Sequence, residues 1–210
     1  SVLALGALAA VGAVAPASAV TLPGNIDSTA VRSLTIHKHA LGPSTPLNPV
    51  STGQQLATPP ADPLAGAQFT ATLVSGIDLT TAAGWTQAAQ LTPAQAAQRN
   101  NTVSFVSSDS NAAGVATFSP DPALYPTGLP IGVYLVTETK LPATATNPAA
   151  PFLVTLPTPT GATGTPSNQW VYDVHVYPKN AVTQLTKTRV PAPAGSVEQR
   201  NPDLIRWAIA

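Results

Sequence analysis

Short segments with the composition and alternation of β-strands limit the folds open to this chain more than any other feature. The segments lie at residues 32–39, 67–74, 101–106, 114–118, 131–139, 152–156 and 170–177. A period of two sends one face of a strand toward a core and the other face away from it. Because long irregular connections separate the segments, the pattern predicts an all-β, immunoglobulin-like β-sandwich.

Residues 77–100 differ in amino-acid composition from the predicted strands. Alanine and glutamine dominate this stretch, and Trp85 supplies one large apolar side chain. Thr92 followed by Pro93 is typical of a helix start, with threonine as the N-cap and proline at the first helical position. We therefore expect a short helical insertion, of one or two helices, between strands of the sandwich.

The two ends of the chain are expected to lie outside the sandwich, which we place at residues 33–180. Residues 1–19 are an apolar run of small residues ending in Ala17, Ser18 and Ala19, which is typical of a signal-peptide remnant with its cleavage site. Residues 20–32 form an N-terminal leader. Residues 181–210 contain two further strand-like segments but are too few to bury a core of their own, so we expect them to be the truncated start of a second immunoglobulin-like domain.

The balance of charges limits the kinds of molecule that the chain can bind. Nine basic and nine acidic residues cancel, and only 9% of the chain is charged, so no basic field is available to hold nucleic acid. The chain has no cysteine. An exported domain without cysteine cannot use disulfide bonds for stability, which leaves room for another kind of covalent link.

Three residues that are costly to bury continue the predicted inward faces of three strands: Lys38, Glu138 and Asn180. The apolar residues on these faces are Leu34 and Ile36 before Lys38, Tyr134 and Val136 before Glu138, and Trp170, Tyr172, Val174 and Val176 before Asn180. Inside one sandwich the three polar side chains would meet. Burial penalises charged groups, which leaves a neutral amine beside a protonated acid. The amine of Lys38 could then attack the Asn180 carboxamide, with Glu138 as the catalytic acid, expelling ammonia and leaving an amide cross-link.

Lys179 directly precedes Asn180, so along a strand its side chain points to the opposite face. We therefore expect it to face solvent. Pro178, directly before it, cannot donate a hydrogen bond to a neighbouring strand and disturbs the register there. A solvent-facing lysine at this point is an accessible nucleophile.

The same residues carry a family resemblance. Trp170, Val174, Val176, Tyr177, Pro178 and Lys179 fill every defined position of the pilin motif W-x-x-x-V-x-V-Y-P-K. Residues 134–142 (YLVTETKLP) resemble the pilin E-box, and residues 64–69 (LAGAQF) resemble a second-strand signature. From residue 33 to residue 180 the chain is similar to the N-terminal Cna-B-like domain of sortase-assembled major shaft pilins of Gram-positive bacteria.

This resemblance implies roles for individual residues. Lys179 would be the amine that a pilin-specific sortase joins to the next copy of the same pilin, which makes a covalent homopolymer with tip and basal pilins as further partners. Lys38, Glu138 and Asn180 fit the positions of an internal isopeptide bond and its acid, and Lys187 fits the cross-linking lysine of the following domain. The implied location is a secreted pilus anchored to the cell wall, although this sequence contains no C-terminal sorting signal.

Other interpretations remain open from the sequence. Lys38, Glu138 and Lys179 could be ordinary surface charges at strand ends. A monomeric wall-anchored adhesin could bind a ligand through residues 42–63 and 77–100. His37, His39 and His175 could share a face, but no cysteine or carboxylate cluster supports a zinc site there. No motif of a turnover enzyme is present, and no cofactor is expected.

Overall fold

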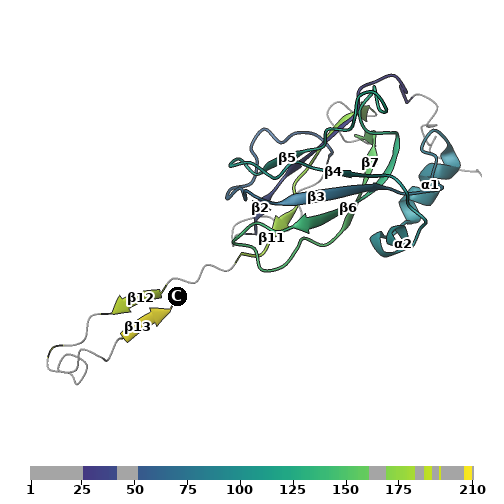
Figure 1. The fold of residues 1–210 in the computed structure, drawn as a ribbon. Helices are drawn as coiled ribbons and strands as arrows, with labels where there is room; N and C mark the ends of the chain where they lie inside the picture. Colours follow the sequence, from purple (N-terminus) through teal and green to yellow (C-terminus); the bar gives the residue numbers. More distant parts are fainter. Residues whose placement is uncertain are drawn as a thin grey trace, which may run out of the picture.

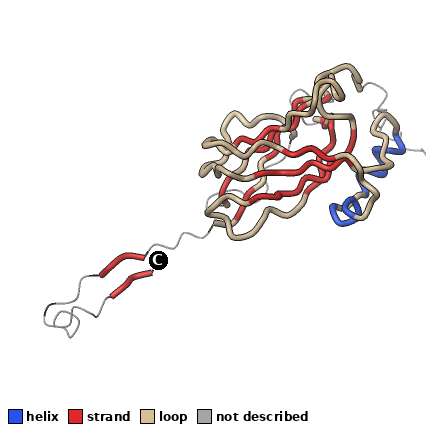
Figure 2. The backbone as a smooth tube through the Cα atoms, viewed as in Figure 1, coloured by secondary structure: helices blue, strands red, loops and turns tan. Residues whose placement is uncertain are grey.

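The computed structural model describes residues 26–41, 52–160, 169–182 and 194, together with the backbone of residues 187–190 and 206–209. The predicted signal-peptide remnant at residues 1–19 lies outside the described residues, as does the leader up to residue 25. The fold is built mainly from strands, and two helices lie at one end of it (Figures 1 and 2).

One layer is a four-stranded antiparallel sheet in the order β4-β3-β6-β7. Its strands are β3 (Gln68–Leu73), β4 (Ser104–Val106), β6 (Gly132–Lys140) and β7 (Phe152–Leu156). The second layer has the order β10-β1-β5, formed by β10 (Asp173–Val176), β1 (Ser33–His37) and β5 (Val115–Thr117). The first and last strands of the domain, β1 and β10, run parallel to each other.

Short strands extend the parallel pair beyond this layer. After Lys38 the chain continues as β2 (His39–Ala40), and after Pro178 it continues as β11 (Lys179–Asn180). These two strands also pair in parallel, with Lys179 opposite His39 and Asn180 opposite Ala40. The pairing brings the beginning and the end of the predicted domain together at one end of the sandwich.

The main core lies between the two layers. It is formed by alternate residues of the facing strands, namely Leu34, Ile36, Phe69, Ala71, Phe105, Ala116, Tyr134, Val136, Val154, Leu156, Val174 and Val176. The residues that alternate along β1, β3 and β6 in the sequence are therefore those that face inward. The predicted all-β sandwich is confirmed.

The predicted helical insertion is also confirmed, and it packs against the outer face of the four-stranded sheet near the start of β6. Helices α1 (Ala82–Gln90) and α2 (Pro93–Ala97) pack over a second apolar cluster that includes Val133 and Leu135. Thr92 caps α2 in a capping box with Gln95, and Pro93 follows it. Strand β6 is consequently buried on both faces, which explains its nearly continuous apolar run.

The prediction of one inward face from Trp170 to Asn180 is wrong in its first part. The segment is interrupted at Tyr172, which separates β9 (Trp170–Val171) from β10, and β9 pairs with β8 (Thr158–Pro159) instead. Val171, rather than its neighbour Trp170, packs against the main core. Trp170 lies against Trp85 of α1, with ring centroids 5.3 Å apart.

The expected strands near the C-terminus are present. Strands β12 (Lys187–Val190) and β13 (Arg206–Ile209) pair with each other in an antiparallel hairpin, drawn apart from the sandwich in Figure 1. That this hairpin begins a second domain stays a prediction. Within the part of the chain that the structure describes, no helix is long and apolar enough to cross a membrane.

Candidate functional site

Lys38 occupies the junction between β1 and β2, where its backbone is held on both sides. Its N–H donates to the carbonyl of Gly114 (2.7 Å), and its carbonyl accepts from the N–H of Leu64 (2.9 Å). Gly114 has a φ of +75°, and a Cβ at this position would overlap the Lys38 carbonyl. The alternation of β1 continues through the junction, so the lysine side chain follows Leu34 and Ile36 into the interior.

Glu138 and Asn180 reach the same place from two other strands. Glu138 lies on β6 opposite Phe69, next to a register shift in the pairing with β3. Asn180 lies on β11, and its carbonyl accepts from the N–H of Leu41 (2.7 Å). Because β11 is parallel to β2, Asn180 arrives beside Lys38 although 142 residues separate them in the sequence.

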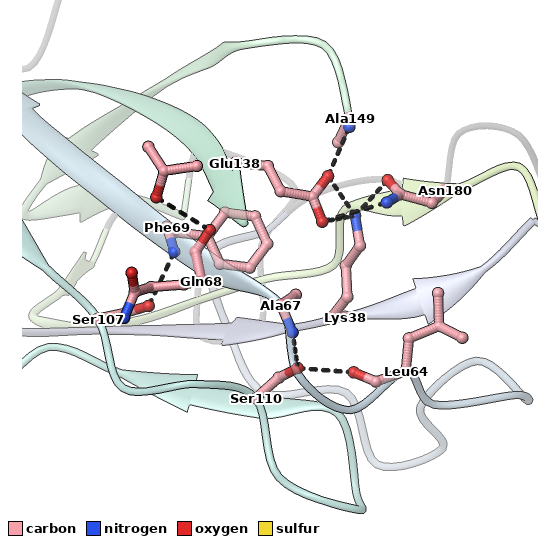
Figure 3. A network of polar contacts seen from close by, with 11 residues as sticks. Lys38, Leu64, Ala67, Gln68, Phe69, Ser107, Ser110, Glu138, Ala149 and Asn180 are labelled. Atoms are coloured by element: carbon pink, nitrogen blue, oxygen red, sulfur yellow. Dashed lines mark hydrogen bonds and ion pairs between the residues drawn. The ribbon is translucent and has the colours of Figure 1, made fainter. Parts of the chain in front are cut away.

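The three predicted polar residues form one buried contact network (Figure 3). The Lys38 amine lies 3.1 Å from Oε1 and 3.2 Å from Oε2 of Glu138, and it also donates to Oδ1 of Asn180. Nδ2 of Asn180 donates to Oε1 of Glu138 at 3.1 Å. The side chains of Lys38 and Glu138 are 0% exposed. The structure therefore brings together the three residues that strand alternation placed on inward faces.

Burial has a direct electrostatic consequence for Lys38. It lowers the pKa of the Lys38 amine, and the attraction of Glu138 opposes this shift only in part. The ring of Phe69 lies 5.6 Å from the amine nitrogen. A lowered pKa increases the fraction of neutral amine, which is the nucleophilic form.

Residues that the sequence reasoning did not single out support this network. The backbone N–H of Ala149 donates to Oε2 of Glu138 at 2.6 Å. The hydroxyl of Ser107 accepts from the N–H of Phe69 (3.0 Å), and that of Ser110 accepts from the N–H of Ala67 (2.9 Å). The two serines lie in the connection between β4 and β5, and no local signal in the sequence shows that they fix the strand carrying Phe69.

The geometry suits an amide-forming condensation. Glu138 contacts both the attacking nitrogen of Lys38 and the leaving nitrogen of Asn180, so one carboxyl group can take a proton from the first and deliver it to the second. A bond from Lys38 Nζ to Asn180 Cγ would form, the bond from Cγ to Nδ2 would break, and ammonia would leave. Two polar side chains would become one neutral amide.

Lys179 lies on the opposite side of β11 from Asn180 and is half-buried rather than fully solvent-facing. Burial lowers the pKa of its amine. Lys179 also lines an open groove of about 750 Å³, which is bordered by β7, β10, α1 and the loop at residues 53–56. Most of the groove's lining is apolar, including Phe152, Val154 and Val176. Lys179 therefore lies at the edge of an open groove on the surface.

The remaining motif residues hold this region together. Val174 and Val176 lie in the main core, and Pro178 accepts a hydrogen bond from the N–H of His39 (3.2 Å). The hydroxyl of Tyr177 accepts from the N–H of Leu56 (2.8 Å), which ties the covering loop to the motif. Lys187 lies in β12, but its side chain is outside the described residues.

Three buried histidines, His37, His39 and His175, lie close to Lys179. The sequence suggested only a zinc site for them, and without supporting ligands. His37 and His175 share a hydrogen bond of 2.8 Å, and the ring of Tyr177 stacks on His37 at 4.5 Å and on His39 at 6.2 Å. Among the described residues no group of three or more metal-binding side chains is arranged to hold a metal ion.

Comparison with known proteins agrees with this architecture. Residues 29–181 match the family model described as the N-terminal domain of Gram-positive pilin subunit D1. The chain is 37% identical over 179 residues to the fimbrial subunit type 2 of Actinomyces naeslundii, covering 79% of this chain and 32% of that protein. The chain thus spans about a third of the length of this curated relative.

Solved structures give the same result. The fimbrial protein FimP from Actinomyces oris has a TM-score of 0.61 and 30% identity, over 83% of this chain and 35% of that one. The major pilin SpaD from Corynebacterium diphtheriae has a TM-score of 0.57 and 29% identity, over 79% of this chain and 36% of that one. The immunoglobulin-like architecture is shared with both.

Proposed function

The chain belongs to the Gram-positive pilin subunit family, and from this premise we propose that the full-length protein is a structural shaft subunit of a covalently polymerised pilus. The subunit is exported and displayed on the cell surface, where the fibre is anchored to the cell wall. Its partners are other copies of the same protein, a pilin-specific sortase, and tip and basal pilins. It is the substrate of the sortase and is not itself a turnover enzyme.

The observation that carries this proposal is the position of Lys179. Its amine is half-buried, carries a lowered pKa and lies on an open, mostly apolar groove. Among the described ion pairs none involves Lys179, so no carboxylate in the described part of the chain holds its amine. Such an amine suits attack on the thioester by which a sortase holds the C-terminal sorting signal of another subunit.

The Lys38, Glu138 and Asn180 network supports a second covalent role in the same subunit. A cross-link between Lys38 on the first strand and Asn180 on the last would join the two ends of the domain that β1, β2, β10 and β11 hold together. Tension applied along the fibre would then be carried by covalent bonds rather than by strand pairing alone. Lys187 is proposed to serve the following domain in the same way.

The test is polymerisation by a pilin sortase in cells that express the full-length protein. Replacement of Lys179 by Ala is expected to abolish the ladder of high-mass polymers on denaturing gels. Replacement of Lys140 by Ala is the matched control, because Lys140 is exposed and pairs only with Asp109 among the described residues (2.5 Å). Polymers that persist in the Lys179 variant would refute the proposal and favour a monomeric wall-anchored adhesin.

A further inference from the structure

His39 has the one side-chain polar atom in the described part of the chain that is buried without a hydrogen-bond partner. This atom is Nε2, and the residue as a whole is 2% exposed. An unsatisfied buried polar atom costs free energy, so its presence calls for a reason other than stability. The surroundings of His39 give that reason.

The register of the short parallel strands places His39 next to Lys179. The two residues are direct partners in the pairing of β2 with β11. Directly opposed residues project from the same face of a sheet and are neighbours there. Lys38 and Asn180 project from the other face, into the interior. Lys179 and His39 therefore form a cross-strand pair outside the main core.

The tautomer of His39 leaves a free lone pair at Nε2. Nδ1 lies 3.1 Å from the carbonyl oxygen of Ala61, and a carbonyl can only accept, so Nδ1 carries the hydrogen. Burial lowers the pKa of the His39 ring, and the positive charge of Lys179 lowers it further. The ring is consequently neutral near pH 7 and can accept a proton at Nε2.

The orientation of the ring is fixed from two sides. Ala61 holds Nδ1, and the ring of Tyr177 stacks on His39 with centroids 6.2 Å apart. An oriented base with its second nitrogen anchored is the arrangement that activates a nucleophile in many acyl-transfer sites. A histidine that served only to fill space would not need the unpaired nitrogen beside a lysine.

Building on the proposed function of Lys179, we propose that His39 is the proton acceptor for the acylation of Lys179. The Lys179 ammonium first loses one proton to solvent. The neutral nitrogen then bonds to the acyl carbon of the neighbouring subunit's thioester, and Nε2 of His39 takes the second proton. The carbon–sulfur bond breaks, and the sortase cysteine leaves as a thiolate with the electron pair of that bond.

The experiment measures acetylation of the folded chain by a small acetyl thioester, without a sortase. Peptide mass spectrometry gives the rate at Lys179 relative to Lys140 in the same sample. In His39→Asn the side-chain amide can still donate to the Ala61 carbonyl, but no nitrogen titrates. We expect the Lys179 to Lys140 ratio to fall about tenfold or more in this variant at neutral pH. His39→Gln, run in parallel, should show the same loss.

The pH profile distinguishes a proton acceptor from a packing residue. In the parent chain the ratio should drop as acidification protonates His39, and this step should be missing in His39→Asn. The charges of Lys179, Asp62, Lys38 and His37 also act on the His39 ring, and Tyr177 stacks on it, so His37→Gln serves as a control and should keep the step. An unchanged ratio and an unchanged profile in His39→Asn would overturn the inference.

A sortase arm separates this inference from the proposed function. If a pilin sortase with a sorting-signal peptide fails to label Lys179 in the parent chain, the proposed function fails, whatever His39 does in thioester acetylation. If the sortase labels Lys179 equally in the parent chain and in His39→Asn, and thioester acetylation is also equal, the function stands and the role of His39 is refuted.

Discussion

The Lys38 amine and the Glu138 carboxylate lie 3.1 Å apart with both side chains withdrawn from solvent. Removing two charges from water costs several kcal/mol per ion, and mutual attraction repays this only when further hydrogen bonds complete the site. Asn180 and the N–H of Ala149 supply those bonds. An unreacted ion pair is thus a costly component of the core, and conversion to a neutral amide would remove that cost.

The cross-link is tested by intact-protein mass. We expect the parent chain to be lighter than its sequence mass by one ammonia, ~17 Da, because the Lys38 nitrogen replaces the Asn180 amide nitrogen. Glu138→Ala should retain the full mass, since the group that moves the proton is gone. Lys140→Met is the control and should show the loss. A parent chain at its full sequence mass would show that Lys38 and Asn180 remain separate.

A variant that cannot form the bond should become more stable as the solution is made more alkaline. In Asn180→Ala, Lys38 stays a free amine whose pKa in the folded state is below the ordinary value of 10.5. Between these two pKa values the unfolded chain binds a proton that the folded chain does not, so the free energy of unfolding rises with pH. Urea titrations up to pH ~9.5, below the usual range of tyrosine, should show this rise.

The control for the alkaline effect is the double variant Lys38→Met with Asn180→Ala. It lacks the titrating amine. The increase of its unfolding free energy with pH should therefore be smaller, by the part that Lys38 contributes. Equal slopes of unfolding free energy against pH in the two variants would show that the buried amine is not the source.

Acid should destabilise the domain through His37. Burial and the neighbouring charge of His175 lower the pKa of His37 below its ordinary value of 6.5. Folding therefore requires the neutral ring, and stability is lost as pH falls from about 6.5 through the lowered folded-state pKa. Denaturant titrations of the parent chain and of His37→Gln, which cannot titrate, should show a shallower acid decline in the variant. His175, His39, Asp173 and Tyr177 also face His37, so some decline should remain.

Gly114 should tolerate a side chain much less well than Gly66. Both have positive φ, +75° and +85°, but a Cβ at Gly114 would overlap the Lys38 carbonyl, whereas a Cβ at Gly66 would meet nothing within 4 Å. Gly66→Ala is expected to cost about 1 kcal/mol from backbone strain. Gly114→Ala should cost roughly 3 kcal/mol or more, because the clash is added to the strain. Chemical denaturation of the two variants makes the comparison, and equal losses would contradict it.

Much of the fold could be predicted because alternation reports which side of a strand faces the core. Leu34, Ile36 and Lys38 share the inward face as expected, and so do Tyr134, Val136 and Glu138. The local signal at Thr92 and Pro93 also sufficed, since capping depends only on adjacent residues. The prediction was wrong for Trp170. The strand is interrupted at Tyr172, so residues before and after the break do not alternate between the same two faces.

By itself, the sequence determined the class of fold, the inward position of Lys38 and Glu138, and the choice of Lys179 as a candidate nucleophile. Only the tertiary structure decided that β2 and β11 pair in parallel, that helices cover the outer face of β6, and that His39 lies beside Lys179. The physical reason is that a two-residue period fixes the direction of a side chain but not its neighbours. Neighbours depend on which distant segments pair with or cover one another, and the local pattern of residues contains no information about those contacts.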